Sequence, residues 1–384
     1  MTGALSGIRV VDLSRVLAGP YATMLLADMG AEVLKVERPG VGDETRSWKP
    51  PTTAEGDSTY FAAVNRNKTA VTADLHDETD VAELRALIAE ADVFIENARP
   101  GTVAARGLSF AELSELNPRL IYCSISGFGT HGGRDLPGFD LLVQAAGGLM
   151  SITGEPDGPP MKVGVALVDV ITGLHAVTGI LAALHARQST GCGQHIEVNL
   201  LSSLLSALAN QASGYVLADV EPGRLGNAHP SIAPYEVLRA ADRTIALAVG
   251  TDAQFAVLAE LVGAPALATD DRYRTNESRV RNREDLVVEL EDRLRLEDAE
   301  TWVERLMARG VPAAPVNTVA EAFAYAERLG LEPVVDVAGV RQVADPIRFS
   351  ATPVDYRTAP PPIGPRVGAR TSVSRARTKE GQHD

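Results

Sequence analysis

The chain has 384 residues, of which 45% are hydrophobic and 22% charged, the profile of a globular protein long enough for two domains. Its formal net charge of -14 disfavours nucleic acid as the main partner, because nucleic-acid binding depends on a basic surface. Two cysteines exclude a disulfide framework, and no signal peptide, membrane-length apolar run or metal-ligand spacing is visible. We therefore expect a cytoplasmic protein without a metal or a membrane partner.

The first half of the chain alternates short β-rich runs with amphipathic helical patterns. We predict strands at 8–13, 32–37, 71–74, 92–96, 120–125 and 194–198, and helices at 20–29, 77–91, 140–149 and 170–187. This alternation is typical of an α/β domain with a Rossmann-like parallel sheet and helices on both faces. In such a sheet the expected ligand site lies beyond the strand ends, where the strand order reverses.

Asp169 follows an apolar run at 163–168 that predicts a strand, and it opens the next helical pattern. A carboxylate at a helix start lies near free backbone N–H groups and the positive end of the helix dipole, which favour its ionised form. An ionised carboxylate in that setting can act as a covalent nucleophile. The simpler alternative is that Asp169 only caps the helix, which is the commoner use of aspartate at this position.

A glycine-rich segment, Gly127 to Gly132, matches the dinucleotide pattern G-x-G-x-x-G and follows a predicted strand. The pattern binds a dinucleotide only when a helix starts directly after it. Here Gly133, Pro137 and Gly138 prolong a loop instead. We therefore predict a flexible active-site loop and not a dinucleotide site.

The second half changes in texture. Residues 200–218 predict one long helix with apolar residues on more than one side, which suits burial by this chain or by a partner. Strands are expected at 235–238, 244–249, 334–340 and 347–349, with charged helices between the second and third of these. The polar segment 366–384 predicts a disordered tail. We assign residues 1–220 to a large domain that contains the nucleophile, 225–330 to a small α+β domain, and 331–365 to a return into the large domain.

Ordered motifs along almost the whole chain resemble the class III CoA-transferases of the CaiB/BaiF type, such as formyl-CoA transferase and carnitine CoA-transferase. These motifs lie at 12–20 (DLSRVLAGP), 28–37 (DMGAEVLKVE), 65–68 (NRNK), 96–101 (ENARPG), 126–129 (SGFG), 144–148 (QAAGG) and 310–316 (GVPAAPV). The resemblance implies a large domain built from both chain ends, a small domain between them, and an interlocked homodimer.

The resemblance also implies a reaction. The family's nucleophile is the aspartate at the start of the helix where Asp169 stands. It would move CoA from an acyl-CoA donor to a carboxylate acceptor, through an aspartyl–acyl anhydride and an aspartyl-CoA thioester. The CoA thioester is then a substrate, and no permanently bound cofactor is expected. Backbone N–H groups at the helix start and in the loop Gly250, Thr251 and Asp252 are the expected donors to the oxyanion.

Carried over by position, the resemblance implies contacts with each part of CoA. The pantetheine would meet Val16, Leu17 and Ala18; the adenine end Arg38; the nucleotide Ala73, Asp74, Leu75, His76, Asn97, Ala98 and Arg99; and the thioester Leu136, Pro137, Gly138 and Phe139. Arg106 stands one position later than the arginine of many relatives and is a weaker candidate for a phosphate contact. Gln144 would lie in the substrate region with the loop at Gly250.

Two alternatives stay open at this stage. The first is a reaction like that of α-methylacyl-CoA racemase, but Phe139 stands where that enzyme has a histidine base, and phenylalanine accepts no proton. The second is an acyl-CoA-binding paralogue without catalysis, in which Asp169 would persist as a helix cap. The loop from Gly250 to Gln254 also departs from the glycine-rich loop of formyl-CoA transferases, so we do not expect oxalate as the preferred acceptor.

Overall fold

The computed structural model describes residues 3–369, and the contacts within the chain divide it into two units. Unit 1 contains the described residues up to Leu149, Lys162–Val220, and those from Glu332 on. Unit 2 contains Met150–Met161 and Glu221–Leu331. The short segment Met150–Met161, which we placed in the large domain, therefore groups with unit 2.

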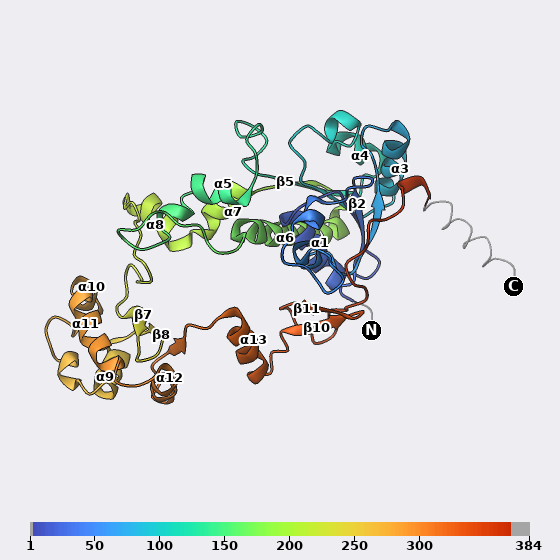
Figure 1. Cartoon of the computed structure of the whole chain (residues 1–384). Helices are drawn as coiled ribbons and strands as arrows, with labels where there is room; N and C mark the ends of the chain where they lie inside the picture. Colours follow the sequence, from blue (N-terminus) through green and yellow to red (C-terminus); the bar gives the residue numbers. More distant parts are fainter. Residues whose placement is uncertain (1–2, 370–384) are drawn as a thin grey trace. The chain divides into compact units, whose positions relative to one another are not determined.

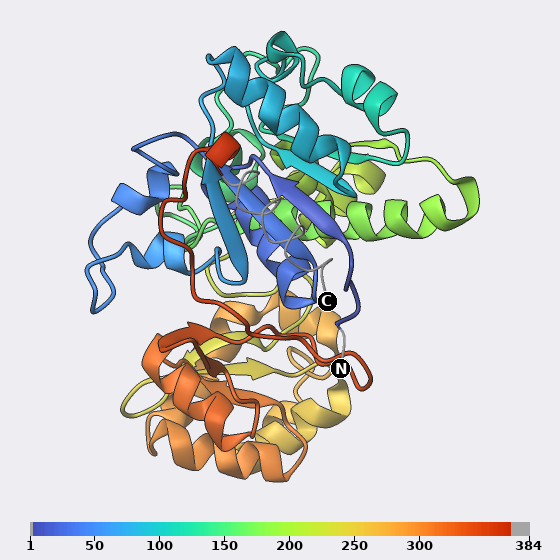
Figure 2. The same cartoon turned by 90° about the vertical axis from the view of Figure 1, so that its right-hand side faces the viewer.

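A six-stranded sheet forms the centre of unit 1 (Figures 1 and 2). Its strands are β1 (Arg9–Asp12), β2 (Glu32–Glu37), β3 (Lys68–Thr72), β4 (Val93–Glu96), β5 (Ile121–Ser126) and β6 (His195–Asn199). All neighbours pair in parallel, in the order β3-β2-β1-β4-β5-β6. The predicted parallel sheet is confirmed, and its strand order reverses between β1 and β4.

Helices cover both faces of this sheet, because successive side chains of a strand point to opposite sides. Val10 of β1 and Ile95 of β4 belong to a core shared with α1 (Ala18–Asp28) and α6 (Leu167–Thr190). Their sequence neighbours, Val11 and Phe94, belong to a second core with α3 (Glu78–Ala89) and α4 (Phe110–Leu116). The two cores hold the strand ends in fixed positions.

Helix α6 is long and apolar enough to cross a membrane, with a mean hydropathy of 1.8 over its best 18-residue window. In the structure it is a core helix of unit 1, packed on α1, β5 and β6 (Figure 1). Its Gly173 lies so close to α1 that a Cβ atom there would stand 2.7 Å from the carbonyl oxygen of Ala18. Part of its apolar surface is thus used for packing within the domain.

Apart from the strand expected at 163–168, which is described with the site below, three predicted elements of unit 1 are wrong. The remaining elements here are α2 (Thr59–Ala62), α5 (Asp140–Ala146), α7 (Leu200–Ala207), α8 (Ala209–Ala218), β10 (Val334–Val337) and β11 (Val340–Val343). The long helix expected at 200–218 is two helices, because Ala209 adopts a φ of 45° and interrupts the hydrogen bonding. The strand expected at 334–340 is a hairpin that turns at Ala338 and Gly339, and no strand forms at 347–349.

The predicted disordered tail begins too early. The backbone N–H of Thr72 donates to the carbonyl of Pro365 at 2.8 Å, so this segment lies beside β3 (Figure 2). The guanidinium of Arg366 pairs with Asp80 at 2.7 Å, and Val367 is buried in the core that contains α3. Residues 370–384, the rest of that prediction, lie outside the described residues.

Unit 2 has its own sheet and its own core. The sheet is antiparallel and consists of β7 (Tyr235–Arg239), β8 (Thr244–Ala248) and β9 (Ala313–Pro315). The helices are α9 (Asp252–Leu261), α10 (Asn276–Arg281), α11 (Arg283–Leu294), α12 (Ala299–Ala308) and α13 (Val319–Arg328). The first two strands were predicted from sequence, whereas β9 was not.

Candidate active site

Two neighbouring cavities lie at the carboxyl ends of the central strands of unit 1. The larger, of about 740 Å³, is lined by residues that follow β1, β4 and β5, and also by Asp140 and Asp169. The smaller, of about 410 Å³, is lined by residues that follow β1, β2 and β3. Arg15 and Ala98 line both cavities, so the two meet where the strand order reverses.

Asp169 is not the cap of its helix. The segment 163–166 forms no strand, and Asp169 is the third residue of α6, after an N-cap position occupied by Ala166. The capping acceptor is Asp140, whose Oδ1 accepts the N–H of Val168 at 2.8 Å and that of Asp169 at 3.3 Å. Because Asp140 accepts the hydrogen bonds of the N–H groups at the start of α6, the side chain of Asp169 is not needed to cap the helix.

The electrostatic environment of Asp169 differs from our expectation. Burial and the neighbouring Asp140 carboxylate raise the pKa of Asp169 to about 7. These two effects oppose the helix dipole, which we expected to keep the group ionised. No ion pair to Asp169 forms within residues 3–369. An uncompensated carboxylate with a raised pKa in a cavity is typical of an active site.

Tyr60 also lines the larger cavity, and sequence reasoning missed it. Burial, followed by the carboxylates of Asp169 and Asp140, raises the pKa of Tyr60 to about 12. The phenol is therefore protonated at neutral pH and lies within the electrostatic influence of Asp169. It can donate a hydrogen bond to charge that develops near that carboxylate.

Most of the oxyanion donors that we expected are already engaged. Asp140 accepts the N–H groups at the start of α6, as described above. The side chain of Gln254 accepts the N–H groups of Gly250 at 3.0 Å and Thr251 at 3.2 Å. By contrast, the cavity-lining segment 164–166 has three N–H groups for which no acceptor exists within the described chain. These three groups are therefore not engaged by another residue of the described chain, which a donor to an oxyanion requires.

Most residues with predicted CoA contacts line one of the cavities. The larger is lined by Val16, Asn97, Ala98, Arg99, Leu136, Pro137, Gly138 and Phe139, and the smaller by Arg38, Ala73, Asp74, Leu75, His76 and Ala98. Arg106 lines neither cavity, but its Nη2 lies 2.7 Å from Nδ1 of His76. Leu17 and Ala18 also line neither, since Ala18 is buried at the start of α1.

Gln144 has a fully buried side chain that lines neither cavity, and its role toward substrate stays a prediction. Its Nε2 donates to Oδ2 of Asp140 at 2.6 Å, and its Oε1 accepts the N–H of Val163 at 2.9 Å. Gln144 therefore positions Asp140 and the segment before α6.

The loop Gly250, Thr251 and Asp252 belongs to unit 2, where Thr251 caps α9 and Asp252 pairs with the buried Arg279 at 2.8 Å. Its role toward substrate stays a prediction.

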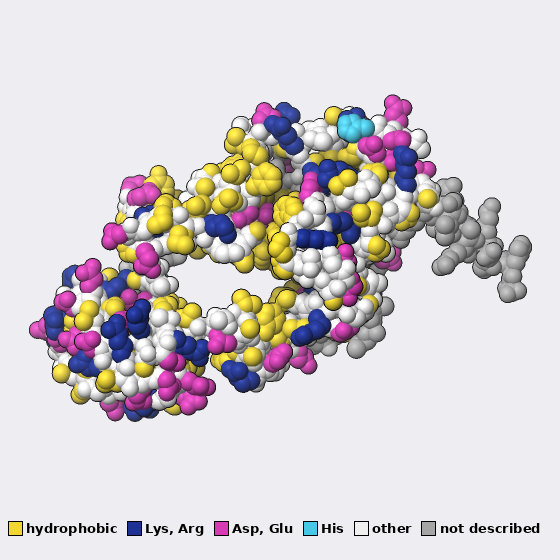
Figure 3. All heavy atoms as spheres, in the orientation of Figure 1, with side chains coloured by type: hydrophobic (Ala, Val, Ile, Leu, Met, Phe, Trp, Pro, Cys, Tyr) yellow, Lys and Arg dark blue, Asp and Glu magenta, His cyan; other side chains and the backbone are white. Residues whose placement is uncertain are grey.

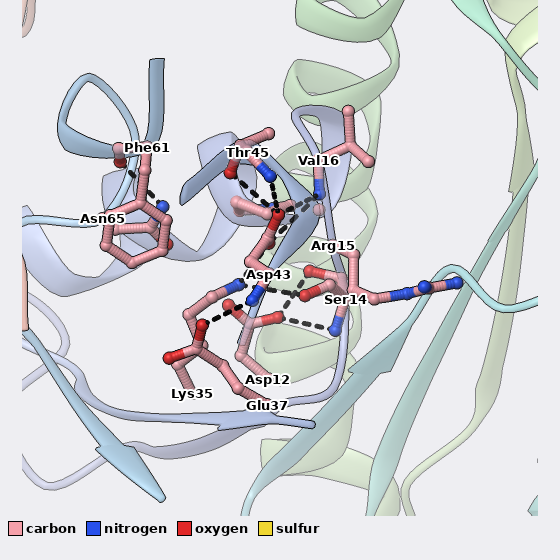
Figure 4. Close-up of polar contacts among 12 residues, drawn as sticks. Asp12, Ser14, Arg15, Val16, Lys35, Glu37, Asp43, Thr45, Phe61 and Asn65 are labelled. Carbon is pink, nitrogen blue, oxygen red and sulfur yellow. Dashed lines mark hydrogen bonds and ion pairs between the residues drawn. The ribbon is translucent and has the colours of Figure 1, made fainter. Parts of the chain in front are cut away.

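A buried charge network supports the turn that follows β1 (Figure 4). Val16 adopts a φ of 68°, a strained conformation for a β-branched residue, and Oδ2 of Asp43 accepts its N–H at 3.2 Å. Nζ of Lys35 donates to Asp43 at 3.0 Å and to the carbonyl of Ser14 at 3.1 Å. The network thus fixes the turn that carries Arg15 and Val16 into the cavities.

The second half of the network lies below the same turn. Nζ of Lys68 donates to Asp12 at 3.2 Å, to the carbonyl of Pro20 at 2.8 Å and to Asn65 at 2.9 Å. Burial acts to raise the pKa of Asp12, but Lys68 and Lys35 outweigh it, so the pKa lies below its ordinary value. Burial lowers the pKa of Lys68 to about 8. Each buried acid is therefore matched by a lysine.

Comparison with known proteins decides the family. The sequence profile of CoA-transferase family III matches residues 5–366. The chain belongs to this family. It is 45% identical over 377 residues to a succinate–glutarate CoA-transferase of Agrobacterium fabrum, with 94% of this chain and 93% of that protein covered. It is 39% identical over 351 residues to an acetyl-CoA:oxalate CoA-transferase of Acetobacter aceti, with 91% and 90% covered.

The fold agrees with the family. A crystal structure of a CaiB/BaiF family protein from Brucella suis, 42% identical, aligns with a TM-score of 0.88 over 97% of this chain and 100% of that one. As a family III CoA-transferase, the protein is an enzyme that uses CoA thioesters as substrates, with an acyl-CoA donor and a carboxylate acceptor. The resemblance inferred from the sequence motifs is confirmed.

Proposed function

We propose that Asp169 is the nucleophile that carries CoA from an acyl-CoA donor to a carboxylic acid. The supporting observation is its setting: a carboxylate without a capping role or a cation, beside a second carboxylate, in a cavity at the strand ends. A structural carboxylate is normally paired or hydrogen-bonded, as Asp12 and Asp43 are here. The isolation of Asp169 therefore favours a chemical role.

The first half-reaction makes and breaks one bond at a time. A carboxylate oxygen of Asp169 bonds to the acyl carbon of the donor, and the C–S bond breaks to release CoA thiolate. The thiolate then attacks the side-chain carbonyl of Asp169 in the mixed anhydride. A C–S bond forms, the donor acid leaves as its carboxylate, and CoA remains on Asp169 as a thioester.

The second half-reaction is the reverse sequence with a new acid. The acceptor carboxylate attacks the aspartyl thioester, which gives a new mixed anhydride and CoA thiolate. The thiolate attacks the acceptor's acyl carbon, forms the product thioester and frees the carboxylate of Asp169. No proton is gained or lost over the cycle, and each step exchanges one activated acyl group for another.

Each attack generates an oxyanion that needs hydrogen-bond donors. The free N–H groups of 164–166 and the protonated phenol of Tyr60 line the same cavity as Asp169. Both are preorganised donors, the kind of group that stabilises developing negative charge. We assign the oxyanion site to them, in place of the donors first expected from the start of α6 and from unit 2.

We further propose that the exchanged acids are small dicarboxylates. The named relatives act on succinate and glutarate or on oxalate, all of which carry a second carboxylate. Three cations line the larger cavity, and two of them are ion-paired: Arg15 with Glu44 and Arg99 with Asp135. The third, Lys162, donates to the carbonyl of Val163 at 3.2 Å and has no ion-pair partner among residues 3–369. Lys162 is therefore the cation free to bind the distal carboxylate.

A homodimer is also proposed. Large apolar side chains are exposed on unit 1, where hydrophobic atoms gather over α5 and α8 (Figure 3). They include Leu141 at 50%, Tyr215 at 56%, Val216 at 72% and Leu217 at 84% exposure. A second copy of the chain would cover them, since exposed apolar patches mark interfaces. Monomers at nanomolar concentration in sedimentation velocity would contradict this.

The cytoplasmic location stays a proposal, in keeping with the free thiols of Cys123 and Cys192.

The function is tested by incubating the enzyme with succinyl-CoA and, in turn, glutarate, mesaconate, oxalate and acetate, and following the new CoA thioester by liquid chromatography. We expect transfer to the dicarboxylates with the wild type and none with Asp169→Asn.

Running the reaction in deuterated water with a 2-methyl-branched acyl-CoA tests racemisation. Deuterium at C2 without transfer would contradict the proposal, and Phe139, exposed in the cavity, offers no base for that exchange.

A further inference from the structure

The side-chain amide of Gln144 contacts both parts of the candidate site. Gln144 lies one turn after Asp140 on the same face of α5, and its Nε2 donates to Oδ2 of Asp140 at 2.6 Å. Its Oε1 accepts the N–H of Val163 at 2.9 Å. Asp140 in turn accepts the N–H groups of Val168 and Asp169. One buried amide thus links the carboxylate beside Asp169 to the segment that leads into the free N–H groups.

We propose that Gln144 is a positioning residue for CoA transfer, which holds the charge of Asp140 beside Asp169 and keeps the free N–H groups of 164–166 in place. Gln144 lines neither cavity, so it acts only through these partners. The inference rests on the proposed function in that Asp169 is the nucleophile and 164–166 supplies oxyanion donors. It adds the residue that holds the two parts in register.

The two partners of Gln144 require a donor and an acceptor side by side. Asp140 offers an oxygen that accepts, and the backbone of Val163 offers an N–H that donates. A neutral amide satisfies both, whereas a carboxyl group does so only while it is protonated. Reversing the amide would set its NH2 group against the N–H of Val163 and its oxygen against the carboxylate of Asp140. The contacts therefore fix both the type of side chain and its orientation.

The helix that carries Gln144 is fixed in the core of unit 1. Its Val143 is completely buried in the core that contains α1 and α6. At the end of α5, a Cβ atom on Gly147 would stand 2.8 Å from the carbonyl oxygen of Val143 and 2.6 Å from Cδ2 of Leu204 on α7. Glycine therefore allows α5 and α7 to pack closely. The sequence motif at 144–148 thus combines the amide with the close packing that holds it still.

The charge that Gln144 holds acts on Asp169. Asp140 accepts N–H donors at both of its oxygens, and such bonds stabilise a carboxylate in its charged form. Burial and then this charge raise the pKa of Asp169. The other titratable groups that line the same cavity are those of Tyr60, Arg15, Glu44, Arg99, Asp135 and Lys162.

The first experiment replaces the amide by a carboxyl group and follows kcat/KM against pH, with succinyl-CoA and the dicarboxylate that reacts fastest. While protonated, the group introduced by Gln144→Glu donates to Asp140 and accepts from Val163, as the amide does. Once ionised, it repels Asp140 and has no proton to donate. Activity relative to the wild type should be within about 3-fold in acid and should fall by about 10- to 100-fold as the pH rises, because the site is displaced.

The reciprocal exchange identifies the contact responsible. When Gln144→Glu is combined with Asp140→Asn, the amide at 140 can donate to the carboxylate at 144, and its oxygen can still accept the N–H of Val168. The fall at high pH should then disappear, which a general loss of packing does not predict. Gln144→Met, which removes both contacts, should lower kcat by about 10- to 100-fold and leave the affinity for CoA, measured by calorimetry, unchanged.

Gln342→Glu is the matched control. Gln342 is also buried, accepts from Arg66 at 3.4 Å and lines neither cavity. This variant should keep the wild-type dependence of kcat/KM on pH. The inference is overturned if the activity of Gln144→Glu relative to the wild type is constant with pH, or if the reciprocal exchange keeps the fall. All these variants retain Asp169, so either result beside an inactive Asp169→Asn rejects the role of Gln144 and not the proposed reaction.

Discussion

Two groups of carboxylates in unit 1 lie close to the cavities and differ in one respect. Under the turn at Val16, Asp12 contacts Lys68 and Asp43 contacts Lys35, and all four side chains are completely buried. At the start of α6, Asp140 and Asp169 lie beside each other, and neither forms an ion pair with any described residue. The first group has opposite charges in contact, whereas in the second two like charges influence each other.

The difference separates structure from chemistry. For both Asp12 and Asp43, lysines and hydrogen bonds outweigh the effect of burial and hold the pKa below its ordinary value. For Asp169, burial and Asp140 act in the same direction and raise the pKa to about 7. Asp12 and Asp43, each paired with a lysine, stabilise the structure beneath the cavity. Asp169 has no such partner, so its ionised form is unfavourable in this environment, and a reaction at the carboxylate can relieve this.

A raised pKa is not sufficient to mark a catalytic group. Burial raises the pKa of Glu96 to about 7 as well. Glu96, however, lines neither cavity, and its Oε2 accepts the N–H of Ala98 at 2.8 Å at the end of β4. Asp169 therefore differs from Glu96 in that it lines the cavity, whereas Glu96 stabilises the backbone at the end of β4.

The largest effect should come from removing the unmatched carboxylate. Asp169→Asn keeps the shape of the side chain but cannot form the anhydride, so kcat for CoA transfer should fall by about 10^4-fold or more. Steady-state kinetics measures this, with CoA affinity as the control for folding. Transfer above one tenth of the wild-type rate would show that another group is the nucleophile.

Breaking the matched group should cost stability. Lys68→Met leaves Asp12 buried without its cation, which should lower the free energy of unfolding by about 3–5 kcal/mol. Urea denaturation measures the loss. The matched control is Arg9→Met, which removes the pair with Glu90 whose side chains are 52% and 74% exposed, and which should cost under about 1 kcal/mol. Equal losses would contradict the distinction between the two groups.

The free cation of the larger cavity offers a specificity test. Lys162→Met should lower kcat/KM for dicarboxylate acceptors by about 10- to 100-fold, the value of a hydrogen bond between charged groups. Acetate, which has no distal carboxylate, should react as with the wild type, and Lys162→Arg should restore part of the loss. A uniform fall for all acceptors would instead assign Lys162 to CoA binding.

A smaller effect should follow from removing the negative charge of Asp140, which leaves Asp169 with a neutral neighbour. Because the nucleophile is the ionised form, kcat/KM of the wild type should rise with pH through about 7, the pKa of Asp169. Asp140→Asn keeps an oxygen for the N–H groups of Val168 and Asp169 but removes the negative charge, so the rise should move to lower pH. An unchanged pH profile would mean that Asp140 does not tune Asp169.

The smallest effect concerns stability. The folded state raises the pKa of Asp169, so it favours the protonated form, and that contribution to stability is lost as the pH rises through about 7. Asp169→Asn avoids the cost of ionisation. Its melting temperature should exceed that of the wild type well above that pH, and the difference should shrink toward acid. A difference that is constant with pH would contradict the raised pKa.

Much of unit 1 follows from local sequence signals. The alternation of strands and helices predicts the parallel sheet, because the repeat of apolar residues that marks a strand or a helix can be recognised within a short segment. The apolar run at 163–168 misled us, since hydrophobicity alone does not distinguish a strand from a bent segment that lines a cavity and leads into a helix. The break at Ala209 is likewise invisible in composition, because it is a matter of backbone conformation.

The site depends on contacts between residues far apart in the chain, which a single sequence does not reveal. Asp140 caps a helix from 28 positions away, and Asn97 holds Arg15 from 82 positions away. Asp169 was identifiable because a helix start is a local signal and the family motifs surround it. The burial of Gln144 could not be predicted from the sequence, because it depends on how α5 packs.

The most direct test of the covalent role is chemical trapping of Asp169. The enzyme is incubated with succinyl-CoA and hydroxylamine, digested, and mapped by tandem mass spectrometry. We predict a hydroxamate on Asp169, dependent on the acyl-CoA and absent from Asp169→Asn and from wild type without substrate. A hydroxamate on another carboxylate, or CoA transfer at the full rate with Asp169 unmodified, would contradict it.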